Sequence, residues 1–168
     1  LILLSEDYLY NPVSDASYVN GIEINKDNLI IDGQGHTIDG ANQARILNVL
    51  AYNATIRNIN FINGNTSFGG ASIFLGGGGA VIDCNFTNNH AWQGGAIDSN
   101  GQTTISNCNF ISNDADISGA VNINGNGSIK NSKFINNTYC KKNQGNKKSR
   151  TWCDTSAACR KSHDDCGC

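Results

Sequence analysis

The 168-residue chain has no methionine, one proline, little charge and no long apolar run. No stretch approaches the roughly 18 apolar residues of a membrane-spanning helix, and the apolar residues 1–4 are too few for the core of a signal peptide. With 15% charged residues and a net charge of −2, the broad basic face of a nucleic-acid-binding protein is excluded. Because methionine is missing even at position 1, we expect a mature or excised segment.

Glycine, asparagine and cysteine are abundant instead, with 19, 26 and 7 residues. Glycine and asparagine tolerate positive φ and are poor formers of helix interiors. A chain so rich in both turns often and regularly, which excludes an all-α fold. The cysteine content favours an oxidising compartment, so we expect an extracellular or cell-surface location.

An internal repeat of about 24 residues runs through the middle of the chain. Its clearest marks are four phenylalanines at steps of 25, 24 and 24 residues: Phe61, Phe86, Phe110 and Phe134. A second motif, [GS]-G-A, follows the same steps at residues 69–71, 94–96 and 118–120. Two motifs in constant phase over several periods identify a repeat protein.

Each repeat contains short runs of alternating apolar and polar residues bounded by Gly and Asn, as strands do. Leucine is too scarce after Leu50 for a leucine-rich repeat. The period therefore predicts an all-β, right-handed parallel β-helix over residues 21–138, with about 24 residues a coil and coils about 4.8 Å apart. The phenylalanines should stack inside. The residues three positions after them should form a turn ladder: Gly64, Asn89, Asn113 and Asn137.

Both ends of the solenoid need covering, because a solenoid end exposes unpaired strand edges. Residues 1–20 are expected to form an N-terminal cap. Residues 139–168 contain no Ile, Leu, Val or Phe but seven of the twelve Lys and Arg residues, so we expect a basic, Cys-rich tail or cap.

Five cysteines in this tail are disulfide candidates: Cys140, Cys153, Cys159, Cys166 and Cys168. Their odd number leaves one for another chain or another role. A weaker alternative is a zinc site using Cys153, Cys159 and His163 with Cys166 or Cys168, although these spacings differ from the usual C-x2-C pairs. A small disulfide-stabilised cap is the favoured interpretation.

The rest of the chain offers little catalytic chemistry. The carboxylates Asp83, Asp98, Asp114 and Asp116 occupy different phases of the repeat, and His36, His90 and His163 lie far apart without a supporting motif. The glycine-rich residues 33–35 and 76–79 complete no phosphate-binding motif and are expected to be tight turns. We therefore predict no catalytic residue, no cofactor and no metal outside the weak zinc candidates.

Cys84 and Cys108 occupy the same inward position in successive coils. Their Cα atoms should lie about 4.8 Å apart, but parallel Cβ vectors suit the disulfide dihedral badly. We expect two free, buried thiols that pack as small apolar groups.

The pairing of G-G-A-[IV], as in Gly94-Gly95-Ala96-Ile97, with F-x-x-N resembles the repeat of chlamydial polymorphic outer membrane proteins. The F-x-x-N matches are residues 86–89, 110–113 and 134–137. Residues 21–40 are similar to the lead-in of adhesin-like surface proteins of methanogenic archaea. The resemblance covers residues 1–138. It implies a pectate-lyase-like right-handed β-helix, secretion and a role in adhesion, and it carries over no catalytic residue.

These observations favour a secreted or cell-surface module whose long faces bind a glycan or a surface protein. One alternative is a glycan-cleaving enzyme of the pectate-lyase-like type. Another is a structural spacer or fibre subunit cross-linked through the tail. Self-association through an odd cysteine or the solenoid ends is also open, whereas no nucleic-acid partner and no membrane span are expected.

Overall fold

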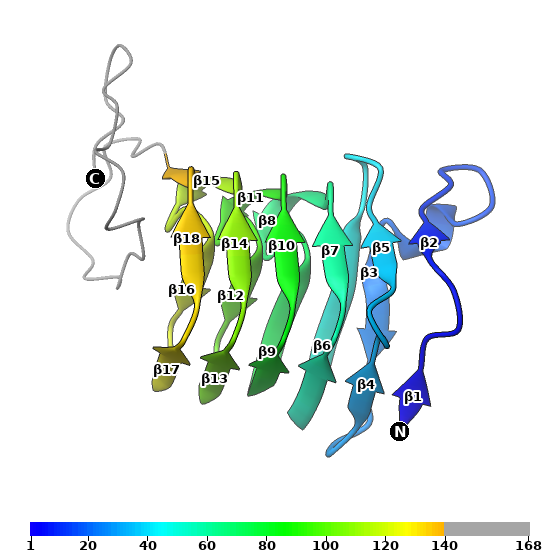
Figure 1. The fold of residues 1–168 in the computed structure, drawn as a ribbon. Helices are drawn as coiled ribbons and strands as arrows, with labels where there is room; N and C mark the ends of the chain where they lie inside the picture. Colours follow the sequence, from blue (N-terminus) through cyan, green and yellow to red (C-terminus); the bar gives the residue numbers. More distant parts are fainter. Residues whose placement is uncertain (140–168) are drawn as a thin grey trace, which may run out of the picture.

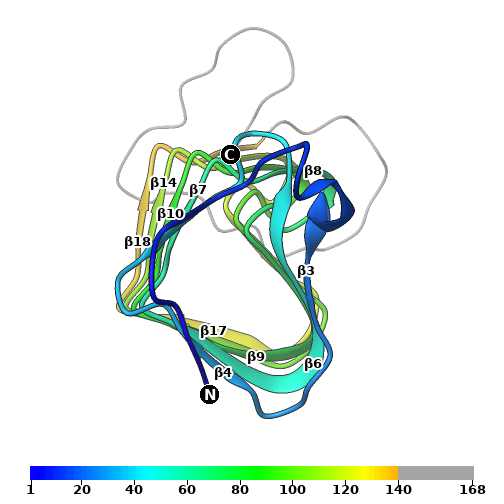
Figure 2. The ribbon, with the colours of Figure 1, turned by 90° about the vertical axis from the view of Figure 1, so that its right-hand side faces the viewer.

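The computed structural model describes residues 1–139, which form a parallel β-solenoid of about five coils with a period of roughly 24 residues. The coils lie side by side along one axis (Figure 1) and superpose when viewed along it (Figure 2). The predicted all-β solenoid is therefore confirmed. Its described part contains one short 3-10 helix, η1 (Ala16–Tyr18), and no helix that could cross a membrane.

Three sheets form the walls of the solenoid, and all their strand pairs are parallel. The first sheet contains β1 (Ile2–Leu3), β3 (Asn20–Ile24), β4 (Ile30–Asp32), β6 (Arg45–Arg57), β9 (Ile73–Ile82), β12 (Ile97–Ser99), β13 (Thr103–Ser106), β16 (Val121–Ile123) and β17 (Gly127–Lys130). The second contains β2 (Tyr8–Leu9), β5 (Thr37–Asp39), β7 (Asn60–Ile62), β10 (Asn85–Thr87), β14 (Asn109–Ile111) and β18 (Lys133–Ile135). The third contains β8 (Asn65–Gly69), β11 (His90–Gln93), β15 (Asp114–Ile117) and β19 (Thr138–Tyr139).

A ladder of phenylalanine rings runs through the core. Phe86 pairs in register with Phe61 on one side and Phe110 on the other, and Phe110 pairs with Phe134. Successive ring centroids lie 5.1, 4.8 and 4.7 Å apart with nearly parallel planes. The strand spacing of about 4.8 Å falls within the favourable range for stacked rings, so ladder and sheet reinforce each other. The predicted internal stack is confirmed.

The asparagine ladder beside it differs from the expected turn ladder, because Asn89 and Asn113 are fully buried. Asn113 Nδ2 donates to the Phe86 carbonyl at 3.0 Å and to Asn137 Oδ1 at 2.9 Å, while its Oδ1 accepts from Asn89. The left-handed backbone conformation falls one residue earlier, at Asn88 for example. A buried amide needs partners for its donors and acceptors, and the next coil supplies them here.

Residues 1–20 form part of a coil whose strands β1 and β2 pair with β4 and β5. Asp7 joins this segment to the first coil, since its Oδ1 accepts from the Thr37 N–H at 2.8 Å and lies 3.2 Å from His36 Nδ1. The bond from Thr37, followed by the one with His36, lowers the pKa of Asp7. The disulfide and zinc candidates Cys140, Cys153, Cys159, His163, Cys166 and Cys168 lie outside the described residues.

Replacing Phe110 with Ala should lower the free energy of unfolding by about 3–5 kcal/mol, because it removes a fully buried ring and leaves a cavity between two others. Chemical denaturation measures this loss. Phe68→Ala is the matched control: its ring is 61% exposed, so the loss should stay below about 1 kcal/mol. Equal losses in the two variants would contradict an internal ladder.

Candidate ligand-binding groove

The first sheet bends round one corner of the solenoid, where β6 and β9 turn from one wall into the next (Figure 2). Residues 76–79, four consecutive glycines, lie at this corner inside β9. The expectation of a tight turn between coils is therefore wrong for this run. A Cβ at Gly77 would lie 2.5 Å from the Ala51 carbonyl oxygen, and one at Gly78, where φ is +75°, would lie 2.3 Å from that of Gln102. Glycine is needed because neighbouring backbones approach too closely for a side chain.

The outer side of this corner is a groove of about 410 Å³. It is lined by Tyr52, Asn53, Gly77, Gly79, Ala80, Gln102 and Thr104. The volume falls within the roughly 300–1,000 Å³ typical of small-ligand sites. None of the lining residues is charged, and they come from three successive coils.

The rim of the groove that Tyr52 and Asn53 form is hydrogen-bonded to the preceding coil. The Tyr52 N–H donates to Asp27 Oδ1 at 2.8 Å, and Asn53 Nδ2 donates to Asn28 Oδ1 at 2.8 Å. The Tyr52 side chain is left 68% exposed. The rim therefore combines a held backbone with an accessible aromatic ring.

The opposite side carries polar groups that have no partner among residues 1–139. Gln102 and Thr104 are exposed, and within this part of the chain their side chains make no hydrogen bond. An amide and a hydroxyl can each donate and accept. The groove thus offers one ring face and several polar atoms to a ligand.

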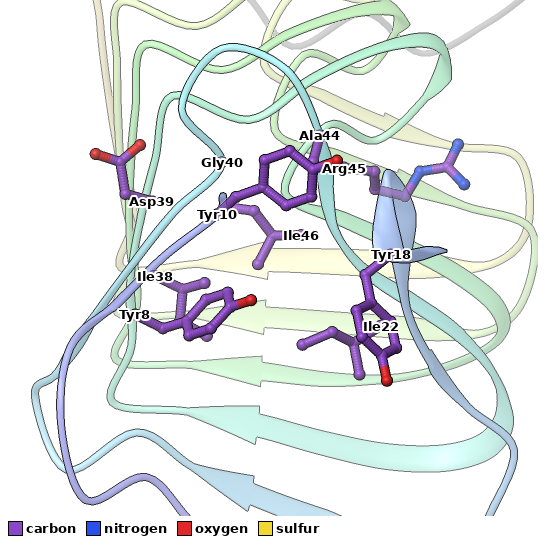
Figure 3. A pocket seen from close by; sticks show the side chains of 10 residues that line it. All are labelled: Tyr8, Tyr10, Tyr18, Ile22, Ile38, Asp39, Gly40, Ala44, Arg45 and Ile46. Carbon is purple, nitrogen blue, oxygen red and sulfur yellow. The ribbon is translucent and has the colours of Figure 1, made fainter. Parts of the chain in front are cut away.

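A second hollow lies under the N-terminal segment, where the core would otherwise be open (Figure 3). The rings of Tyr8, Tyr10 and Tyr18 surround it, whereas Asp39 and Arg45 point away from it. Its volume of about 20 Å³ holds about one water molecule, which excludes an organic ligand. Partial burial, helped by the hydrogen bond to Asp15, raises the pKa of Tyr8 to about 12. This hollow is the covered end of the core.

His90 and Asp114 form a pair across adjacent coils of the third sheet, with Nδ1 and Oδ2 2.8 Å apart. Thr138 Oγ1 donates to the other carboxylate oxygen at 2.6 Å. Their separation of 24 residues, one period, is the sequence signal for this contact, which a comparison of carboxylates alone does not contain. Both side chains are about half exposed, and no hydroxyl or thiol of the described chain hydrogen-bonds to His90, so the pair lacks a nucleophile.

Asp98 is the one deeply buried carboxylate among the four candidates. Its Oδ1 accepts from Asn122 Nδ2 at 2.7 Å and from Gln93 Nε2 at 3.3 Å. Burial raises the pKa of Asp98. Nearby, the Arg45 guanidinium donates to the Gly69 and Gly70 carbonyls between the rings of Phe68 and Phe74. This cluster ties coils together and is closed to ligands.

The remaining candidates stay apart. Asp83 sits in an exposed left-handed turn and accepts from Asn107, and no bond joins it to Asp98, Asp114 or Asp116. Among residues 1–139 no three His, Cys, Asp or Glu side chains are grouped to hold a metal.

Cys84 and Cys108 are free and buried, as predicted. Cys84 Sγ donates to the Ile82 carbonyl at 3.2 Å, and Cys108 Sγ donates to that of Ser106 at 3.2 Å. The hydrogen bond with Cys108, together with burial, raises the pKa of the Cys84 thiol. A buried thiol that resists ionisation is a packing group, since reactivity requires the thiolate.

Comparisons of the chain with protein families, curated proteins and solved structures find no match.

Replacing Asp98 with Asn tests the buried carboxylate. A raised pKa in the folded state means that this group contributes stability below the ordinary carboxyl pKa and that the contribution is lost as pH rises through the raised value. The wild-type stability minus that of Asp98→Asn, measured by denaturation from pH 3 upward, should therefore fall with rising pH. Hydrogen bonds that lower the pKa of Asp7, Asp15 and Asp32 act oppositely, but they are present in both proteins and cancel.

Asp83→Asn is the control for this measurement, because Asp83 is exposed at a turn position where the other coils carry asparagine. The same difference measured for Asp83→Asn serves as the reference for an exposed carboxylate. An Asp98→Asn curve that falls no more steeply than this reference would show that Asp98 is solvated in solution.

Proposed function

We propose that this protein is a glycan-binding module of the extracellular or cell-surface type. The sugar would bind in the groove lined by Tyr52, Asn53, Gln102 and Thr104, which we call the Tyr52 groove. The observation that carries the proposal is the exposed Tyr52 ring beside an uncharged groove with unused polar groups at Gln102 and Thr104. The sequence resemblance to adhesin-like surface proteins also supports a binding role at the cell surface.

A sugar ring matches this combination chemically. Its C–H face is apolar and packs against an aromatic face, while its hydroxyls donate and accept hydrogen bonds at the edge. Tyr52 supplies the first contact, and the side chains of Asn53, Gln102 and Thr104 supply the second.

The solenoid holds these groups before a ligand arrives. Tyr52 and Asn53 are anchored to the preceding coil, and Gln102 is joined to β9 because its carbonyl accepts from the Gly79 N–H at 2.9 Å. A preorganised site loses less conformational entropy on binding, which favours affinity.

The lining also supports binding without cleavage. Glycoside hydrolysis uses two carboxyl groups about 5–9.5 Å apart across the scissile bond. No Asp or Glu of the described chain lines the groove. The Asp98 carboxylate is already bonded to Asn122, that of Asp114 is bonded to His90 and Thr138, and neither residue lines the groove.

The test is Tyr52→Ala on a glycan array, followed by titration calorimetry with the oligosaccharide that binds best. Loss of one aromatic contact, about 0.5–1.5 kcal/mol, should weaken binding about two- to twelvefold. Tyr52→Phe should bind nearly as well as wild type, because it keeps the ring.

Trp92→Ala is the matched control, since Trp92 is an exposed aromatic on the third sheet, away from the groove. Its affinity should match that of wild type. An array without binding, or equal affinity for wild type and Tyr52→Ala, would contradict the proposal.

A further inference from the structure

We infer that the Tyr52 groove is selective for neutral glycans and discriminates against carboxylated ones, an inference that rests on the proposed glycan binding. Two features of the structure bear on the charge of the ligand: the side chains that line the groove and the charged groups around it.

A negative charge lies at the rim of the groove. Asp27 is exposed, and its carboxylate is bonded directly to the backbone of Tyr52 at the rim. A uronic acid stacked on Tyr52 would bring a second carboxylate towards this one. Like charges at short range raise the free energy of the complex.

None of the described Lys and Arg side chains that could offset this repulsion lines the groove. Arg57, on the same strand as Tyr52, has its Nε 2.9 Å from Asp32 Oδ2. Arg45 is buried and donates to backbone carbonyls. The three described lysines, Lys26, Lys130 and Lys133, do not line the groove.

The longer-range field acts in the same direction. Residues 1–139 contain eleven Asp and Glu against five Lys and Arg, a net charge of −6. With residues 140–168 included, the net charge of the chain is −2, so its long-range field opposes the approach of a polyanion weakly and most strongly at low salt.

The polar lining suits hydroxyls better than carboxylates. A sugar hydroxyl both donates and accepts, as do the amides of Asn53 and Gln102 and the hydroxyl of Thr104. A carboxylate only accepts, so it can use the N–H and O–H donors of these side chains but leaves their oxygen acceptors without a partner. Removing that charge from water without a cation is unfavourable.

The experiment compares ligands that differ in one group. Oligosaccharides of β-1,4-linked glucan, mannan and galactan are each tested before and after oxidation of the C6 hydroxyl to a carboxylate. At about 50 mM salt, wild-type protein should bind a neutral form at least tenfold more tightly than its oxidised partner, and added salt should narrow the difference because it screens the repulsion.

Thr104→Lys places a cation in the groove and should raise the affinity for the oxidised form by tenfold or more, whereas the control Thr104→Ser should keep the wild-type preference. Gln102→Lys repeats the test if Thr104→Lys does not fold. Equal or tighter wild-type binding of oxidised forms, lost in Tyr52→Ala, would overturn the neutral selectivity and leave glycan binding standing. No binding of either form would overturn both.

Discussion

Hydrogen bonding between parallel coils places each residue about 4.8 Å from its counterpart one period away, and the rest of the structure depends on this stacking. Inside the solenoid it brings like residues together, as when Phe86 stacks between Phe61 and Phe110. A slip of one residue would turn the rings outward, because side chains alternate between the two faces of a strand. Stacking of the rings therefore stabilises the register in which the backbone hydrogen bonds form.

The buried asparagines show a second consequence of the same spacing. Chain reversal at the corner after each phenylalanine leaves backbone groups inside, and an amide from a neighbouring coil meets them: Asn89 Nδ2 reaches the Phe61 carbonyl, and Asn113 Nδ2 that of Phe86. Each amide also bonds the next one along the ladder. Leaving a buried amide unpaired costs free energy. The buried asparagines therefore stabilise the backbone conformation of the corner, as the aromatic rings stabilise the core.

The groove lies where the ladder is broken. Tyr52 pairs with Gly77, and Gly79, two residues further on, pairs with Thr103 of the next coil, so Gln102 and Thr104 follow the glycines on the outer surface. A uniform ladder at this corner would make a flat wall. A large ring in one coil, missing side chains in the next and polar side chains in the third create a hollow on a rigid frame.

The sequence by itself determined the solenoid, the inward phenylalanines and the free thiols of Cys84 and Cys108. A period of about 24 residues repeats the same apolar pattern, and the burial of apolar side chains then decides which face of each strand points inward. The separation of His90 and Asp114 by one period likewise indicates that their side chains meet across adjacent coils. The tertiary structure alone decided the groove. Tyr52 and Gln102 lie fifty positions apart in dissimilar segments, and the glycines between them look like a turn when read locally. Those glycines form a bend inside β9 because the backbones of three coils meet there too closely for any Cβ, and such a contact depends on coordinates that no period in the sequence contains.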